Sequence, residues 1–258
     1  AHERRGAALV GLSLARPLVE ALASGGAVFG VFAGEGGPDG EGGRSGVAGE
    51  VAVGRGGSGV PDFAFYDLET ATWDMDALRA WCSGGSDGAP ATLLRIPPVG
   101  DAADDARRRV AEGIAAGADG LIVPQVESPD EVAVAVAALR AAGRRLWPAD
   151  ADADTLLVAQ IESRSAVAAA GEILGADGVA VGLPGQKDLR ASYAGDERAV
   201  QEAVEEVRRV CDSLGVPCGV TAGSGDVVRR LEQGFRFIIA TAPEAVAVGR
   251  ARQGAWKS

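Results

Sequence analysis

The chain has 258 residues, 47% of them hydrophobic, which is enough for one large domain with a full core. Its formal net charge is −11, and this acidic balance argues against a protein that binds nucleic acid. No apolar run approaches the roughly 18 residues needed to span a membrane, and the three cysteines have no paired spacing, so we expect free thiols and a cytoplasmic location with no membrane partner.

Short apolar runs alternate along the chain with longer stretches rich in Ala and Arg. Ahead of the first run, Ala7–Ala23 predicts an extra N-terminal helix that closes the bottom of the fold. Most of the runs are almost continuously apolar, as parallel strands buried on both faces are. They predict eight strands, at Ala27–Phe32, Asp62–Tyr66, Thr92–Arg95, Gly120–Val123, Leu156–Ile161, Gly178–Val181, Val216–Val220 and Phe235–Ile239.

Segments with apolar residues three and four positions apart lie between these runs and predict helices. They are Asp74–Trp81, Asp104–Ala116, Pro129–Ala142, Ser165–Leu174, Glu197–Leu214 and Asp226–Gln233. Two stretches, Gly117–Pro124 and Gly175–Gly182, have similar sequences. In both, a helix is expected to end at Gly and an Asp-Gly turn to lead into a buried strand. Eight repeats of strand and helix predict a closed (β/α)₈ TIM barrel, an α/β fold that forms a single domain over residues 1–258.

The segment Ala33–Val60 departs from this pattern, with twelve glycines in 28 residues. Each glycine inside a helix costs about 1 kcal/mol relative to Ala, so we expect a flexible insertion with one short helix near Val47–Val53. The insertion is either a lid over the active face or a loose surface loop.

Active sites of such barrels lie at the carboxyl ends of the strands. The only histidine, His2, is near the N-terminus of the sequence, which removes a Ser-His-Asp triad and a His-based zinc site unless that terminus folds into the site. The polar residues at the strand ends are Asp67 and Glu69 (second strand), Arg95 (third), Gln160 and Glu162 (fifth) and Asp188 (after the sixth).

Glu162 and Asp188 follow neighbouring strands, which are about 4.8 Å apart, so their carboxylates can converge on one point. Two carboxylates so close repel each other unless a cation lies between them. Mg²⁺ (or Mn²⁺ or Co²⁺) suits such a pair of oxygen ligands. The alternative is a salt bridge at the rim between Glu162 and either Arg164 or Arg190.

Gln160 and Glu162 lie on one face of the fifth strand and point into the mouth of the barrel, with Arg95 across the opening. The planar guanidinium of Arg95 suits a carboxylate, so a small 2-oxo acid that chelates the metal would have its developing enolate charge neutralised there. We expect Gly185 and Thr221, after the sixth and seventh strands, to contact the substrate as well. The alternative for Arg95 is an ion pair with a nearby acid.

Taken in this order, the motifs resemble the HpcH/HpaI aldolase family of metal-dependent pyruvate aldolases, over about Ala27–Ala251. The resemblance implies a homo-oligomer, commonly a hexamer of dimers that exchange their last helices. It also implies that Glu162 and Asp188 are the metal ligands and that Arg95 binds the substrate. The motifs that carry it are Val28–Phe32, Phe65–Glu69 (the family's Asp-x-Glu-His), Leu94–Pro97, Gly117–Pro124, Gln160–Glu162 and Asp177–Gly182 with Asp188 beyond it.

The sequence departs from this family where its general base should be. Thr70 stands where the family has a His, and the Asp that partners that His falls near Ala115. The stretch from Gly182 to Asp188 is also longer than the family's compact Gly-Pro-x-Asp. The half of the site that stabilises an enolate is therefore expected to be present, while the usual half that moves protons is not.

That difference bears on the reaction, because aldol cleavage needs a base and decarboxylation of oxaloacetate does not. An enolate made by decarboxylation can attack another carbonyl, as in the related macrophomate synthase. We therefore expect a carbon–carbon lyase or synthase that acts through a pyruvate-type enolate, with Glu69, Asp67 or a metal-bound hydroxide as candidates to replace the His.

Two other functions remain open at this point. Loss of the base is also consistent with a non-catalytic barrel that binds a ligand or partner. Thr221–Gly225 follows the seventh strand, where barrels often hold phosphate, although such a loop is more commonly a tight turn.

Overall fold

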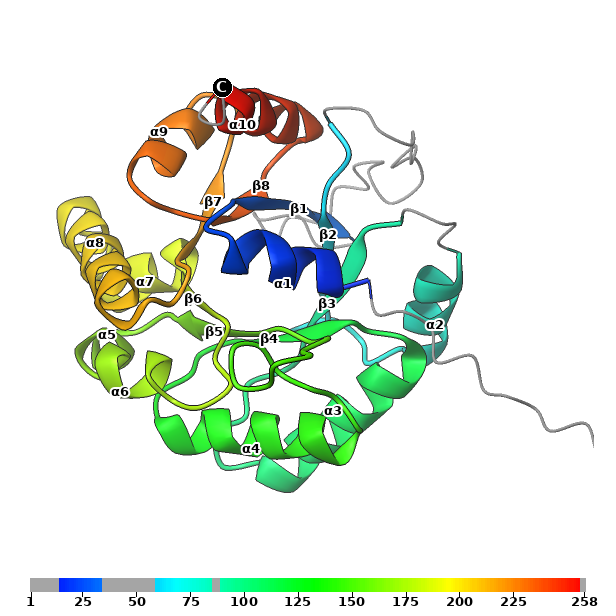
Figure 1. Ribbon diagram of the computed structural model, residues 1–258. Coiled ribbons are helices and arrows are strands. Elements are labelled where there is room, and N and C mark those ends of the chain that lie inside the picture. Colours follow the sequence, from blue (N-terminus) through cyan, green and yellow to red (C-terminus); the bar gives the residue numbers. More distant parts are fainter. Residues whose placement is uncertain (1–13, 34–58, 85–88, 256–258) are drawn as a thin grey trace, which may run out of the picture.

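The fold is an eight-stranded parallel barrel surrounded by helices (Figure 1). The computed structural model describes residues 14–33, 59–84 and 89–255. The sheet order β6-β5-β4-β3-β2-β1-β8-β7 follows the chain around a ring, as a (β/α)₈ barrel requires. The strands are β1 Val28–Ala33, β2 Phe63–Asp67, β3 Ala91–Arg95, β4 Gly120–Val123, β5 Leu157–Ile161, β6 Val181–Pro184, β7 Gly219–Ala222 and β8 Phe237–Ala240.

Helices cover the outside of the ring (Figure 1). Capping residues mark several of their ends: Asp74 and Asp196 accept N–H bonds at the starts of α2 and α8, and Gly117 and Gly215 end α3 and α8 with φ of 116° and 69°. The described helices are α1 Arg16–Ala23, α2 Met75–Ser83, α3 Ala103–Ala116, α4 Pro129–Ala141, α5 Arg164–Ala168, α6 Ala170–Leu174, α7 Gln186–Ser192, α8 Glu197–Leu214, α9 Val227–Glu232 and α10 Pro243–Ala255. No helix in the described ranges is long and apolar enough to cross a bilayer.

The ring is nearly closed between the two edge strands of the sheet, β6 and β7. A single parallel bridge pairs Gly182 with Cys218, and the Gly182 N–H donates to the Pro217 carbonyl at 3.1 Å. The other neighbouring strands form regular parallel ladders.

The inside of the barrel is apolar along most of its length. Its core includes the inward residues Phe63 and Phe65 of β2, and the Phe63 ring stacks on that of Phe237 with 4.3 Å between centroids. Helix α1 lies across the opening at the amino ends of the strands (Figure 1), where Leu18 and Leu22 join this core. The extra N-terminal helix is thus confirmed for Arg16–Ala23, and the rest of the predicted span lies outside the described residues.

The inward positions become polar only at the carboxyl ends of the strands. Asp67 follows Phe63 and Phe65 on the inner face of β2, because successive side chains alternate between faces. By the same alternation Arg95 follows Leu93 on β3, and Gln160 follows Val158 on β5. The barrel therefore gathers its polar side chains at one end.

Several predicted boundaries are wrong. Gly178–Ala180 are buried and Val216–Cys218 are half-buried to buried, but both segments precede their strands, so β6 begins at Val181 and β7 at Gly219. The segment predicted as one helix over Ser165–Leu174 is two short helices with Ala169 between them, and α7 and α10 were not predicted. Most of the glycine-rich insertion, residues 34–58 with the helix predicted near Val47–Val53, lies outside the described residues, as does His2.

Candidate active site

Arg95 and Asp67 are bound to each other across neighbouring strands at the carboxyl end of the barrel. They are paired in the register of β2 and β3, which places their side chains side by side. Arg95 Nε donates to Asp67 Oδ1 at 2.9 Å, and Nη2 donates to Asp67 Oδ2. This is the two-pronged geometry that makes arginine–carboxylate pairs strong and directional.

The remaining contacts of Arg95 extend the cluster. Its Nη1 lies 2.8 Å from Glu69 Oε2 and donates to Gln160 Oε1 at 3.4 Å. The guanidinium carbon lies 5.1 Å from the centroid of the Phe65 ring. The predicted alternative for Arg95, an ion pair with a nearby acid, is therefore formed, and both of its partners are themselves predicted site residues.

Glu162 is the most deeply buried acid of the site, with 4% of its surface exposed. Its Oε1 accepts from Gln160 Nε2 at 3.0 Å, and its Oε2 accepts from the backbone N–H of Gln125 at 2.8 Å. Burial raises the pKa of Glu162 from 4.5 to about 7; the Gln125 N–H opposes this, and the charges of Asp188 and Glu69 add to it.

The predicted alternative for Glu162, a salt bridge at the rim, is not formed in the described structure. Arg190 pairs with Glu197, and the guanidinium of Arg164 lies 4.6 Å from the centroid of the Tyr193 ring. Burial also raises the pKa of Glu69, although Arg95 and the Gln125 side-chain amide oppose the rise. The site thus concentrates negative charge in a place that disfavours it.

Asp188 lies in the first turn of α7, and the chain reaches it differently from the prediction. Gly182–Pro184 belong to β6 and α7 begins at Gln186, so the stretch from Gly182 to Asp188 is strand and helix rather than a long loop. The charge of Asp188 raises the pKa of both Glu162 and Glu69, so the three carboxylates are close enough to interact electrostatically.

Gly185, between β6 and α7, contacts Glu162. A Cβ atom placed on Gly185 would lie 2.1 Å from Glu162 Oε1, a separation that no side chain can adopt. Its N–H donates to the Ile161 carbonyl at 3.0 Å, which ties this turn to β5. Glycine is therefore required here to let the Glu162 carboxylate occupy its position, a reason that the sequence alone did not provide.

The donor set fits a hard divalent cation. Among the described residues no group of three or more His, Cys, Asp or Glu side chains is arranged to hold a metal, so the protein supplies a pair at most. Mg²⁺ is commonly bound by one or two carboxylates, with water and substrate oxygens completing its coordination. A buried carboxylate with a raised pKa beside a second acid is a chemical match for that pair, and a cation would relieve the repulsion between them.

Gln125 belongs to the site and was missed by sequence reasoning. It follows β4, and its side-chain Nε2 donates to Glu69 Oε1 at 2.9 Å while its N–H donates to Glu162. Its φ of 50° is unusual for a residue with a side chain. The one signal in the sequence was its position at the carboxyl end of a predicted strand.

Thr221 lies half-buried on β7, on the same inner face as Gly219 and therefore toward the interior of the barrel. The loop after it does not favour phosphate, because the N–H of Gly223 donates to Asp226 Oδ1 at 2.8 Å and a carboxylate already occupies that position. Thr70, at the position where a His was expected, is exposed, and Ala115, near the position expected for the partner Asp, lies on α3.

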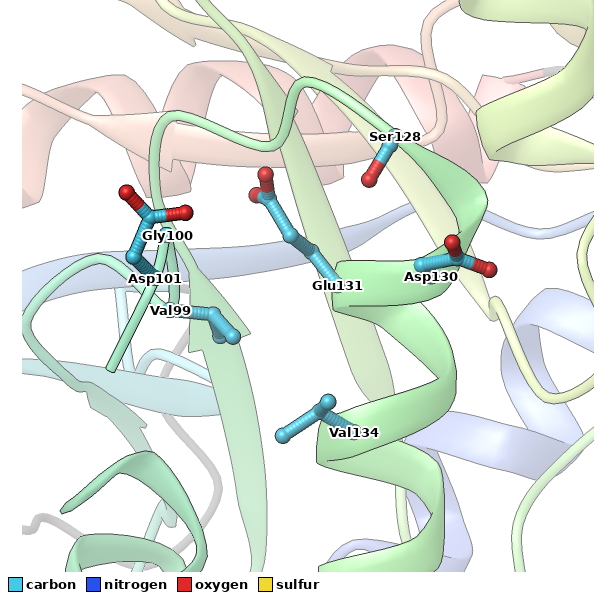
Figure 2. Close-up of a pocket in the computed structure, with 7 residues that line it drawn as sticks. All are labelled: Val99, Gly100, Asp101, Ser128, Asp130, Glu131 and Val134. Atoms are coloured by element: carbon cyan, nitrogen blue, oxygen red, sulfur yellow. The ribbon is translucent and has the colours of Figure 1, made fainter. Parts of the chain in front are cut away.

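A separate pocket of about 340 Å³ lies outside the barrel mouth, between the loop after β3 and the start of α4 (Figure 2). The carboxylates of Asp101 and Glu131 face each other across it. The pKa of Glu131 is raised mainly by burial and, to a smaller extent, by the negative charges of Glu127 and Asp101. Its lining residues are Val99, Gly100, Asp101, Ser128, Asp130, Glu131 and Val134. With three acids and no basic residue among them, this pocket is a poor place for an anionic substrate.

Comparisons with known proteins agree with this architecture. The family model described as HpcH/HpaI aldolase/citrate lyase matches residues 69–249. No curated protein sequence matches the chain.

Solved structures match over most of their length at low identity, which establishes a shared fold. An HpcH/HpaI aldolase from Desulfitobacterium hafniense DCB-2 is 20% identical with a TM-score of 0.68, covering 93% of this chain and 95% of its own. Macrophomate synthase is 17% identical with a TM-score of 0.62, at 95% and 87% coverage. The protein CitE from Mycobacterium tuberculosis, in complex with magnesium and acetoacetate, is 17% identical with a TM-score of 0.58, at 88% and 90% coverage.

Proposed function

Because the chain belongs to the HpcH/HpaI aldolase/citrate lyase family, we propose that it is a divalent-metal-dependent carbon–carbon lyase or synthase that acts on a small 2-oxo acid through a pyruvate-type enolate. The observation that carries the proposal is the cluster at the barrel mouth. There Arg95 lies among Asp67, Glu69 and Gln160, beside the buried carboxylate of Glu162, whose pKa is raised to about 7.

In this proposal Arg95 binds the carboxylate of the substrate and neutralises the negative charge that grows on it during the reaction. Gln160 holds both Arg95 and Glu162 through its two amide atoms, so it fixes the distance between the substrate clamp and the cation site. Glu162 and Asp188 would hold Mg²⁺, Mn²⁺ or Co²⁺. Bound there, the cation would supply Lewis-acid polarisation of the oxo group.

The proton-transfer step is assigned to carboxylates, since Thr70 is exposed and has no basic group. Glu69 is the stronger candidate over Asp67, because burial raises the pKa of Glu69, whereas both carboxylate oxygens of Asp67 already accept from Arg95. Decarboxylation of a 2-oxo diacid requires no such base, so it is the reaction that these residues support with the fewest further requirements.

Two neighbours in fold support this class of chemistry. The CitE structure is described as a complex with magnesium and acetoacetate, a 3-oxo acid, and macrophomate synthase has the same barrel. The homo-oligomer expected from the family resemblance stays a prediction, and gel filtration with light scattering would measure it.

The decisive experiment follows two reactions with Mg²⁺: release of CO₂ from oxaloacetate, corrected for the metal-only rate, and exchange of the pyruvate methyl protons with deuterated solvent. Glu162→Gln should abolish both, while Glu172→Gln, a change at an exposed residue of α6, should leave them unaltered. If the wild type catalyses neither reaction but binds Mg²⁺ and oxalate, the non-catalytic barrel replaces this proposal. If it binds neither ligand, both are wrong.

A further inference from the structure

Gln125 has an unusual backbone conformation at the mouth of the barrel. Its φ of 50° makes it one of two non-glycine residues in the described part of the chain with positive φ, the other being Ala194. Such a conformation is unfavourable for a residue with a Cβ and persists where the surroundings fix it, often beside a functional site. Gln125 itself is exposed, so burial of its side chain is not what holds it there.

What holds Gln125 is a pair of hydrogen bonds to two different acids. Its backbone N–H donates to Glu162 Oε2 at 2.8 Å, and its side-chain Nε2 donates to Glu69 Oε1 at 2.9 Å. The first contact depends on the path of the main chain alone. The second depends on the side-chain amide, so a substitution can remove one and leave the other.

These two bonds complete a closed ring of five residues, in which Gln125 takes part through both its side chain and its backbone N–H. Glu69 Oε2 contacts Arg95 Nη1, and the same nitrogen donates to Gln160 Oε1. Gln160 Nε2 then donates to Glu162 Oε1. Each carboxylate in the ring therefore has one oxygen fixed by Gln125 and the other fixed from the opposite side.

We infer that Gln125 is a positioning residue that holds Glu69, and through it the substrate clamp Arg95, in register with the cation site; this inference rests on the function proposed above. The Glu69 side chain is only 9% exposed, so water replaces a lost hydrogen bond to its Oε1 poorly. Without the Gln125 amide, Glu69 turns about its remaining contact and Arg95 moves with it. The backbone bond to Glu162 is unaffected by that change.

Loss of the Gln125 side-chain amide should weaken the binding of oxalate and leave the binding of Mg²⁺ almost unchanged. In Gln125→Ala the Mg²⁺ dissociation constant should stay within twofold of wild type, because the N–H to Glu162 remains. The affinity of the Mg²⁺-loaded protein for oxalate, an analogue of the pyruvate enolate, should fall about tenfold, the equivalent of one lost hydrogen bond to a charged group. Calorimetry measures both without any need for turnover.

Two further variants separate the amide from volume and from backbone strain. Gln125→Met keeps the length of the side chain without a donor, and Gln125→Gly relieves the positive φ; both should lose the same affinity for oxalate as Gln125→Ala. Gln201→Met, at an exposed position of α8, should lose none. Unchanged oxalate binding in Gln125→Ala, or a parallel loss of Mg²⁺ affinity, would overturn the inference.

A second measurement keeps the test independent of the proposed function. If the wild type binds neither Mg²⁺ nor oxalate, that function fails, but the ring can still be tested by urea unfolding of Gln125→Ala, Glu69→Ala and the double variant. Coupling between the two sites, with the second change costing less once the first is made, supports the inference. Strict additivity contradicts it.

Discussion

Replacing Glu162 by Gln should stabilise the protein at alkaline pH when no divalent cation is present. For a carboxyl whose pKa is raised by folding, the cost of ionisation is absent below the unfolded pKa near 4.5 and complete above the folded pKa of about 7. Since one pKa unit corresponds to about 1.4 kcal/mol, the ionised Glu162 lowers the free energy of unfolding by about 3 kcal/mol at pH 8.

Glu162→Gln removes this cost of ionisation, but part of the resulting stabilisation is offset by a lost hydrogen bond. The wild-type carboxylate accepts from both Gln160 Nε2 and the Gln125 N–H, whereas a Gln side chain has only one acceptor oxygen. The second donor is left facing an NH₂ group, which costs about 1–2 kcal/mol. The net stabilisation is therefore about 1–2 kcal/mol at pH 8, or roughly 2–8 °C in Tm for a domain of this size.

Thermal unfolding at pH 8 and pH 5, each in EDTA, measures this difference. The Tm of Glu162→Gln should exceed that of wild type at pH 8 and approach it at pH 5, where the wild-type side chain is protonated. Saturating Mg²⁺ at pH 8 should raise the Tm of wild type and leave that of the variant unchanged. A variant that is no more stable than wild type at pH 8 refutes the burial argument, and Glu172→Gln should match wild type throughout.

Further predictions concern Arg95, Gly185 and the pH dependence of Mg²⁺ binding. Arg95→Lys keeps the charge but loses the two-pronged contact with Asp67, so kcat/KM for oxaloacetate should fall about 100-fold, as expected for a preorganised group that stabilises developing charge. Gly185→Ala places a Cβ against Glu162 Oε1 and should remove the Mg²⁺-induced rise in Tm; Gly171→Ala, where a Cβ meets nothing within 4 Å, should not. Mg²⁺ affinity measured by calorimetry should fall as pH drops through about 7, because a proton competes for Glu162, and binding below that pH should release a proton.

The architecture and most of the site could be predicted from the sequence because both depend on local patterns. Strand β4 has the predicted bounds, since Gly120–Val123 is an apolar run limited by an Asp-Gly turn and a Pro. Asp67, Arg95 and Gln160 follow from the alternation of side chains along buried strands. Positions at the carboxyl ends of strands therefore provide a reliable guide to the polar mouth.

What could not be predicted depends on contacts between distant segments. Gly178–Ala180 is as apolar as a strand, but the regular ladder with β5 begins only at Val181, after one bond from the Ala180 N–H to the Leu157 carbonyl. Helix α7 has one fully buried residue, Leu189, so no periodic pattern marked it. The bend at Gln125 arises from two acids that approach it from other strands, and nothing in its own neighbourhood specifies a positive φ.

The charge balance of the mouth implies an order of binding. Asp67, Glu69 and Glu162 lie around Arg95, which already directs its Nε and both Nη atoms to Asp67, Glu69 and Gln160. An anionic substrate thus meets a site that repels it, with little free donor capacity to compensate. In the proposed function, a divalent cation held by Glu162 and Asp188 would reverse much of that repulsion, so we expect it to bind before the substrate. Oxalate should accordingly give no calorimetric signal in EDTA and a clear one with Mg²⁺; equal affinity under both conditions would show that the carboxylates do not set the order.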